Sequence, residues 1–206
     1  MNIICGPETD KRTVRINLPR EKSKIGVLIS GGIDSAILYY ILLLENKLRN
    51  NRHEILPISI MRAEGSEYFS KLVVASINEK FKLPNVEATI VGDPTLPDDQ
   101  QVKSGVDDAL ELGFNLVYAG VIEQQEEHMI GWVPPPSGET KRFKTPFKNI
   151  NKTHIIELVT KFKQEDLFYI THTCNVYKVG RCHQCNGCNE RAWGFEQLGL
   201  TDPGTI

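Results

Sequence analysis

The chain has 206 residues, a formal net charge of −2 and 40% hydrophobic residues. This length is typical of one domain with at most a small appendage, and the apolar content is enough for a packed core, so global disorder is not expected. The near-neutral charge balance argues against a strongly basic field, and we therefore expect no nucleic-acid partner.

Apolar runs in the sequence are short. The longest, from Ala36 to Leu44, has nine residues, whereas a helix that spans a bilayer needs ~18. The first ten residues also lack the basic head and long apolar core of a signal peptide. We therefore expect no membrane association and a cytoplasmic location.

Apolar runs typical of buried strands alternate with helical patterns about five times along the chain. The predicted strands are 24–29, 54–60, 86–91, 115–119 and 167–171, and the predicted helices are 34–46, 68–81, 102–112, 152–162 and 186–198. This alternation predicts an α/β fold in which a parallel, twisted five-stranded sheet carries helices on both faces, as in Rossmann-like proteins. Asn151 is the predicted N-cap of the helix that begins at residue 152.

The pattern also suggests how the chain is divided. Residues 1–23 form an N-terminal extension, residues 24–171 form the α/β domain, and residues 172–206 form a cysteine-rich segment that packs on the same domain. Residues 13–18 alternate in polarity, which is typical of an added edge strand that can pair across a homodimer.

The loop Ser30-Gly-Gly-Ile-Asp-Ser35 joins the first predicted strand to its helix. Its two glycines let the backbone approach a phosphate closely, and the N–H groups at the helix N-terminus then face the anion. Ser30 and Ser35 add hydroxyl donors, while Asp34 either caps the helix or holds Mg²⁺. A tight turn without a ligand is the alternative, but the full string is far more specific than a bare Gly-Gly pair. It lacks the lysine of a Walker loop.

Four of the five cysteines lie within fifteen residues, at Cys174, Cys182, Cys185 and Cys188. Two Cys-x2-Cys spacings and four thiolates are typical of one closed, tetrahedral, structural zinc site. His183 is a competing ligand, and an iron–sulfur cluster is possible in principle. The fifth cysteine, Cys5, is better explained as a buried or incidental thiol than as a nucleophile.

Several charged residues have a functional and a structural interpretation. Arg191 either pins the cysteine segment to the sheet or meets substrate. Basic residues after the three prolines 134–136 either close over phosphates or form a solvated face, and polar residues after the fourth strand either contact substrate or form an exposed acidic helix. The first group is Lys141, Arg142 and Lys144, and the second is Glu123, Glu126, Glu127 and His128.

The glycine loop resembles the Ser-Gly-Gly-x-Asp-Ser signature of the PP-loop ATP pyrophosphatases, an adenine nucleotide alpha hydrolase-like superfamily. The resemblance implies that the loop holds the β,γ-pyrophosphate of ATP with Mg²⁺, and that AMP is transferred to a substrate oxygen and then displaced. It implies catalytic roles for Asp34 and Lys152. The implied nucleotide-binding residues are Ile29, Ser30, Gly31, Gly32, Asp34, Ser35, Ala36, Ser59, Met61, Gly120 and Lys152.

The C-terminal third is similar to the 7-cyano-7-deazaguanine synthase (QueC) family. The matching segments are Thr145-Pro146 with Lys152, Thr171-His-Thr-Cys174, and the last three cysteines with Arg191 and the tail 199–203. The resemblance implies an ATP-dependent C–N ligase of 7-deazaguanine (queuosine-type) biosynthesis. Such an enzyme adenylates 7-carboxy-7-deazaguanine and uses ammonia to give the amide and then the nitrile, and the family places this lysine near the ATP phosphates.

The middle of the chain departs from that family. Residues 61–65 read Met-Arg-Ala-Glu-Gly where the family shows an Asp-Tyr-Gly-Gln-like stretch, and residues 96–101 replace its Val-Pro-Gly-Arg-Asn segment. Two alternatives therefore stay open: an adenylating enzyme with a different acceptor, and a non-catalytic module that binds zinc and a nucleotide or nucleic acid.

Overall fold

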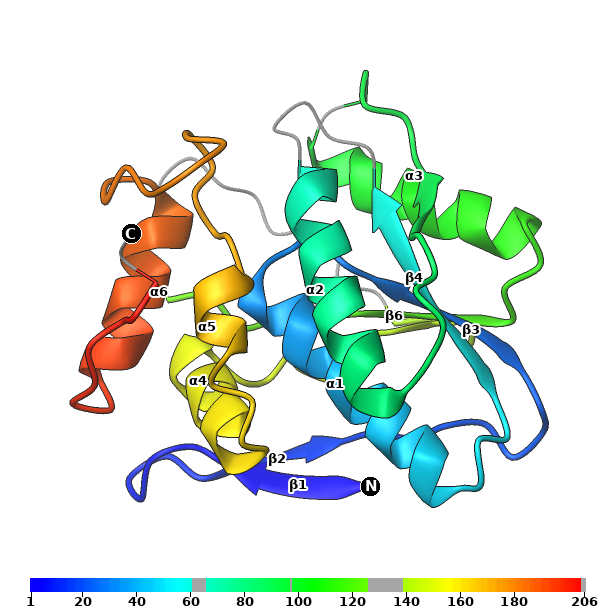
Figure 1. Cartoon of the computed structure of the whole chain (residues 1–206), viewed down its shortest axis with the longest axis horizontal. Helices are drawn as coiled ribbons and strands as arrows, with labels where there is room; N and C mark the ends of the chain where they lie inside the picture. Colours follow the sequence, from blue (N-terminus) through cyan, green and yellow to red (C-terminus); the bar gives the residue numbers. More distant parts are fainter. Residues whose placement is uncertain (61–65, 97, 126–138, 205–206) are drawn as a thin grey trace.

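The computed structural model describes residues 1–60, 66–96, 98–125 and 139–204. Its centre is a parallel five-stranded sheet in the order β5-β4-β3-β6-β7, seen in Figure 1. The strands are β3 (Lys24–Leu28), β4 (Glu54–Ile60), β5 (Thr89–Val91), β6 (Leu116–Ala119) and β7 (Phe143–Lys144). The central position of β3 agrees with its sequence, since strands covered on both faces are continuous apolar runs.

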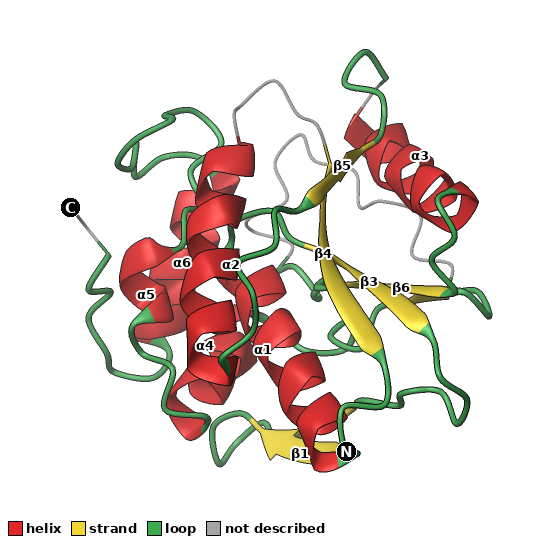
Figure 2. Ribbon diagram, turned by 45° about the vertical axis from the view of Figure 1, so that its right-hand side comes forward, coloured by secondary structure: helices red, strands yellow, loops and turns green. Residues whose placement is uncertain are grey.

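Helices cover both faces of this sheet (Figure 2). On one face lie α1 (Ile33–Leu48), α2 (Ser66–Phe81) and α4 (Lys152–Lys161), and on the other lies α3 (Asp98–Glu111). Each face has its own apolar cluster, a large one that includes α1 and α4 and a smaller one in which α3 meets β6 and β7. The predicted fold class is therefore confirmed. No described helix is long and apolar enough to cross a membrane.

The cysteine-rich segment leads into α6 (Asn186–Glu196), which packs against α4 at the left of Figure 1. Gly199 follows this helix with φ of 65°, a left-handed conformation that ends helices and favours glycine. The four-cysteine segment followed by a helix is thus as the sequence predicted.

The predicted strand 167–171 is wrong. Leu167–Ile170 forms the one-turn helix α5, and the Thr171 hydroxyl donates to the Leu167 carbonyl at 2.6 Å. Four apolar residues in a row fit a buried strand and a buried helical turn equally well, so periodicity could not separate them. The fifth strand is instead β7, whose two residues are too short to show a pattern.

The strand predicted at 13–18 is present in part, as residues 12–15, but it is not an edge strand of the main sheet. Arg12–Arg15 forms β2, which pairs antiparallel with β1 (Asn2–Cys5) in a separate two-stranded sheet. Val14 and Ile16 are buried in the large apolar cluster with α1 and α4, instead of extending the main sheet. The hairpin formed by β1 and β2 lies beneath these helices in Figure 1.

Candidate functional site

A cavity of about 150 Å³ opens where β3, β4 and β6 end. Its walls are mostly apolar, and its polar side chains are Ser30, Asp34 and Ser35, all from the glycine loop and the start of α1. Ligands of open α/β sheets bind at this carboxyl edge of the strands. The lining residues are Leu28, Ile29, Ser30, Asp34, Ser35, Ile60, Val102, Ala119, Gly120 and Val121.

The glycine loop is a strained turn that only glycine can make at one position. Gly31 has φ of 81°, and a Cβ there would lie 2.5 Å from Cβ of Phe69. The Ser35 hydroxyl shapes the turn from inside, since it donates to the Gly32 carbonyl at 3.0 Å and accepts from the Ser30 N–H at 3.2 Å. Because Gly32, the N-cap of α1, provides no side-chain cap, the first N–H groups of this helix are left for a ligand.

Gly120, directly after β6, brings a second backbone against the loop. A Cβ at Gly120 would lie 2.9 Å from the Asp34 carbonyl carbon and 3.0 Å from the Ser35 nitrogen. Both are backbone atoms, which cannot swing away as a side chain can. Gly120 thus allows the end of β6 and the first turn of α1 to form one continuous wall of the cavity.

The partly exposed Asp34 and the buried Lys152 form an ion pair. The Lys152 ammonium donates to both carboxylate oxygens of Asp34, at 2.7 and 2.6 Å, and lies 3.2 Å from Oε2 of Glu190. Only 2% of the Lys152 side chain is exposed. Burial alone would lower the pKa of Lys152, but the charges of Asp34 and then Glu190 outweigh it and raise the pKa above its ordinary value.

The helix that carries Lys152 begins as predicted. The Asn151 side chain accepts hydrogen bonds from the N–H groups of Thr153 and His154, so Asn151 is the N-cap of α4. The interpretation of Asp34 as a helix cap is wrong, because the N-cap of α1 is Gly32 and Asp34 is bound to Lys152.

Other predicted nucleotide-binding residues lie less directly at the cavity. The Ala36 N–H donates within the chain to the Gly32 carbonyl at 3.1 Å. Ser59 is fully buried, with its hydroxyl 3.4 Å from that of Ser70, and its neighbour Ile60 lines the cavity in its place. Met61 lies outside the described residues, as do Glu126, Glu127 and His128.

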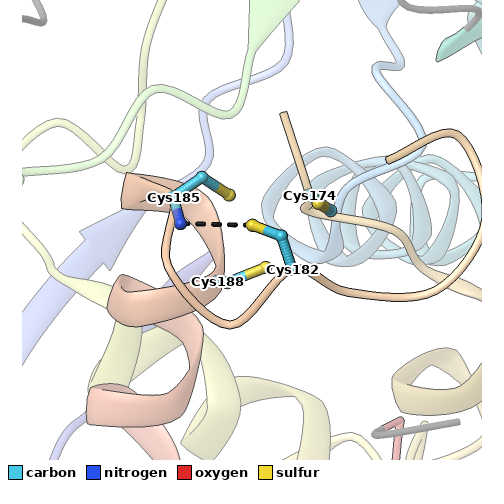
Figure 3. Close-up of side chains that lie close together, drawn as sticks. All are labelled: Cys174, Cys182, Cys185 and Cys188. Atoms are coloured by element: carbon cyan, nitrogen blue, oxygen red, sulfur yellow. Dashed lines mark hydrogen bonds between the residues drawn. The ribbon is translucent and has the colours of Figure 1, made fainter. Parts of the chain in front are cut away.

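The four clustered cysteines point their sulfurs toward one another (Figure 3), and all four Sγ atoms lie within 4.8 Å of each other. A tetrahedral ion with metal–sulfur bonds of about 2.3 Å places its sulfurs about 3.8 Å apart, so the four side chains fit a single metal ion. His183 is not a member of this cluster. Cys5, the last residue of β1, is fully buried, and burial raises its pKa to about 12, as expected for an inert thiol.

Backbone N–H groups surround the sulfurs. Tyr177 donates to Cys174 at 3.2 Å, and Cys185 donates to Cys182 at 3.3 Å, the bond dashed in Figure 3. Burial opposes ionisation of Cys174, but such donors prevail and lower its pKa to about 6, whereas burial raises the pKa of Cys188 to about 12.

His172 connects the cysteine segment to the glycine loop. Its backbone N–H donates to the Gly31 carbonyl at 3.0 Å. Its imidazole ring stacks on the ring of Phe69, with centroids 4.3 Å apart. Its Nε2 lies 3.1 Å from the carbonyl oxygen of Gly180, in the loop between the first two cysteines. His172 was noticed in the sequence only as part of the family-like string Thr171-His-Thr-Cys174, without a role of its own. Glu190 was not singled out, because it belongs to no local motif.

Arg191 has a structural role. It is fully buried and donates to both carboxylate oxygens of Asp202, to the Thr171 hydroxyl and to the Phe168 carbonyl. These bonds tie α6, α5 and the C-terminal tail together. Arg191 is therefore a structural pin, but it joins the cysteine segment to α5 and the tail and not, as predicted, to the sheet.

Arg142 and Glu123 are not among the residues that line the cavity. Arg142 donates to the carbonyls of Phe114 and Asn115, just before β6 begins, which is the opposite end of the sheet from the glycine loop. The expectation that Arg142 closes over phosphates is therefore wrong. Glu123 is bound to Arg12 of the hairpin.

Comparisons with known proteins point to one family for the C-terminal part. Residues 124–199 match the family described as "Queuosine biosynthesis protein QueC". No curated protein matches the chain. Residues 24–45, which carry the glycine loop, lie outside the matched range.

Two solved structures are similar at low identity. One is "U34-tRNA thiolase NcsA from Methanococcus maripaludis with its [4Fe-4S] cluster", with 17% identity, a TM-score of 0.49, and coverage of 90% of this chain and 68% of that one. The other is the NAD+ synthetase from Burkholderia pseudomallei, with 16% identity, a TM-score of 0.41, and coverage of 67% and 59%. The family match to residues 124–199 confirms the resemblance seen in the sequence: over this segment the chain is QueC-like.

Proposed function

We propose that the chain is an ATP-dependent ligase of the 7-cyano-7-deazaguanine synthase type. The observation that carries the proposal is the ion pair between the buried Lys152 and Asp34, which lines a cavity whose other polar side chains come from the glycine loop. Three groups suited to binding the phosphates of Mg·ATP meet here: the N–H groups at the N-terminus of α1, the Lys152 ammonium, and the Asp34 carboxylate, which can hold Mg²⁺. The QueC-like segment, which includes Lys152, supports the choice of family.

In the proposed reaction, an oxygen of 7-carboxy-7-deazaguanine attacks the α-phosphate of ATP, and pyrophosphate leaves. Ammonia then displaces AMP to give the amide. The amide oxygen then attacks a second ATP, with loss of pyrophosphate and one N–H proton, and loss of AMP and the remaining N–H proton gives the nitrile. The Lys152 ammonium would stabilise the charge that develops on the departing pyrophosphate, and Asp34 would hold Mg²⁺.

The test is a mass-spectrometric assay with ATP, ammonia and 7-carboxy-7-deazaguanine. We expect amide or nitrile product with AMP and pyrophosphate, and a loss of about 100-fold in rate for Lys152→Gln. Lys161→Gln is the matched control, because Lys161 is at the opposite end of the same helix and contacts the hairpin carbonyl of Ile4. A purified, metal-loaded chain that forms no AMP with this acid would exclude the substrate.

A second candidate keeps the adenylation but changes the acceptor. It is favoured by the family match, which begins at residue 124 and leaves out the divergent residues 61–101. Screening carboxylates, amides and modified nucleobases for AMP release separates it from the first. A non-catalytic module would instead keep its cellular function in Asp34→Ala and Lys152→Ala variants but lose it in a Cys185→Ser variant.

We propose further that the cysteine centre holds one structural zinc ion. The close spacing of the four sulfurs supports a single ion, since an iron–sulfur cube carries its thiolates on the outside and spaces them more widely. Metal analysis is expected to give about one zinc per chain, and Cys185→Ser should lose the metal and destabilise the fold. Stoichiometric iron and sulfide in anaerobically purified protein would contradict zinc.

A further inference from the structure

Glu190 is the second carboxylate at Lys152, and it comes from a different part of the chain than the glycine loop. It lies on α6, two residues after Cys188, and its side chain is 9% exposed. Asp34 lines the cavity, whereas Glu190 is not among the lining residues. The Lys152 ammonium therefore has one carboxylate at the cavity and another away from it.

Lys152 has two carboxylate partners, although one would balance its charge. Lys152 is the first residue of α4, where the helix dipole disfavours a cation, and it is fully buried, so it needs a negative partner. Asp34 alone meets that need with two hydrogen bonds. If Asp34 turned to another cation, Glu190 would be the carboxylate that still balances the charge of Lys152. Without Glu190, the incoming phosphate would be the only anionic partner of Lys152.

We propose that Glu190 is a positioning residue that keeps the Lys152 ammonium in place when Asp34 releases it to bind the magnesium ion of the nucleotide. The inference rests on the proposed function, since it assumes that Mg·ATP enters this cavity. It assigns the three charged groups separate roles: Asp34 exchanges partners, Lys152 meets the phosphates, and Glu190 stays bound to Lys152 throughout.

The test measures Mg·ATP affinity by calorimetry on the metal-loaded chain, so that no acceptor substrate is needed. Glu190→Gln keeps the shape and an oxygen acceptor but removes the charge. In this variant Lys152 has no charged protein partner left once Asp34 has turned to magnesium. We therefore expect Mg·ATP binding to weaken about tenfold. Glu196→Gln, an exposed change on the same helix, should bind like the wild type. Glu190→Asp, which keeps the charge, should recover part of the loss.

A double-mutant cycle separates positioning from a general structural role. In a Lys152→Gln background, Glu190→Gln should cause no further loss of affinity, because Glu190 acts through Lys152. Equal losses in both backgrounds would overturn the proposal, and so would unchanged or tighter binding by Glu190→Gln alone. Tighter binding would show that Glu190 only repels the phosphates. A wild-type chain that binds no Mg·ATP would instead overturn the proposed function, before any substitution is made, and this inference with it.

Discussion

At Gly120 the backbone approaches the first turn of α1 so closely that there is no room for a Cβ. We therefore expect this position of the cavity wall to be sensitive to any substitution. In Gly120→Ala, the new Cβ would press on the Asp34 carbonyl and the Ser35 nitrogen. Since backbone has to move, we expect the variant to lose about 1–3 kcal/mol of stability. We also expect a larger proportional loss of Mg·ATP affinity, because the displaced atoms belong to the glycine loop.

The measurement pairs urea unfolding with nucleotide calorimetry at the same temperature. Gly105→Ala is an informative comparison, since the atoms nearest to its Cβ would be side-chain atoms of Ile60 and Val91, which can adjust. A Gly120→Ala chain that binds Mg·ATP normally would show that the turn after β6 does not shape the nucleotide site.

The residues that line the cavity and the charged residues that are grouped with Asp34 differ in how easily they can be recognised in the sequence. The glycine loop could be found because its six residues are contiguous and follow an apolar strand. Lys152 could be found only through resemblance to a family. Glu190 could not be found, since its partner lies 38 positions away and nothing local distinguishes it from a solvated helix residue. Charge pairs between distant segments become visible only when the fold brings them together.

The C-terminal tail is held to α5 and α6 by one carboxylate between two arginines. Asp202 accepts from Arg181 and twice from Arg191. Burial alone would raise the pKa of Asp202, but the hydrogen bonds and charges of the arginines hold it below its ordinary value of 3.8. A carboxyl group with a depressed pKa stabilises the fold above its unfolded pKa, and this contribution is lost as the pH falls through the folded pKa.

We therefore expect Asp202→Asn to lose about 3 kcal/mol at pH 7, because it leaves two buried guanidinium groups with a neutral partner. The difference from the wild type should shrink as the pH is lowered from about 4, where the carboxyl group of the unfolded chain begins to be protonated, through the lower pKa of the folded chain. Urea unfolding at the two pH values measures both effects, with the exposed Asp107→Asn as control. A difference that does not change with pH would show that shape, and not charge, holds the tail.

Element boundaries show where local pattern stops being informative. The long helices were found to within a few residues because their apolar faces repeat over several turns. The segment 167–170 is too short to repeat, and its aromatic and β-branched residues favour a strand, yet it forms a helical turn beside α6. Tertiary packing decides such segments, as it does the two-residue strand β7 that completes the sheet.

The N-terminal hairpin is joined to the rest of the molecule by contacts of several kinds. Val14 and Ile16 belong to the same apolar cluster as α1 and α4. The Tyr118 hydroxyl of β6 donates to the Asn17 carbonyl at 2.7 Å, and Arg12 donates to the Asn149 carbonyl at 2.8 Å, just before the helix that carries Lys152. Such contacts suggest that residues 1–23 support the α/β core and do not form a separate appendage.

This leads to a prediction about unfolding. Ile16→Ala removes a fully buried side chain, and we expect a loss of about 3 kcal/mol. If the hairpin is part of one cooperative unit, the loss should appear in a single transition that fluorescence and circular dichroism report at the same denaturant concentration. Ile4→Ala is the matched control, because Ile4 is in the same hairpin with 58% of its surface exposed, and it should change stability by less than about 0.5 kcal/mol. An early, separate transition in Ile16→Ala, with the main transition unmoved, would instead establish the hairpin as an independent extension.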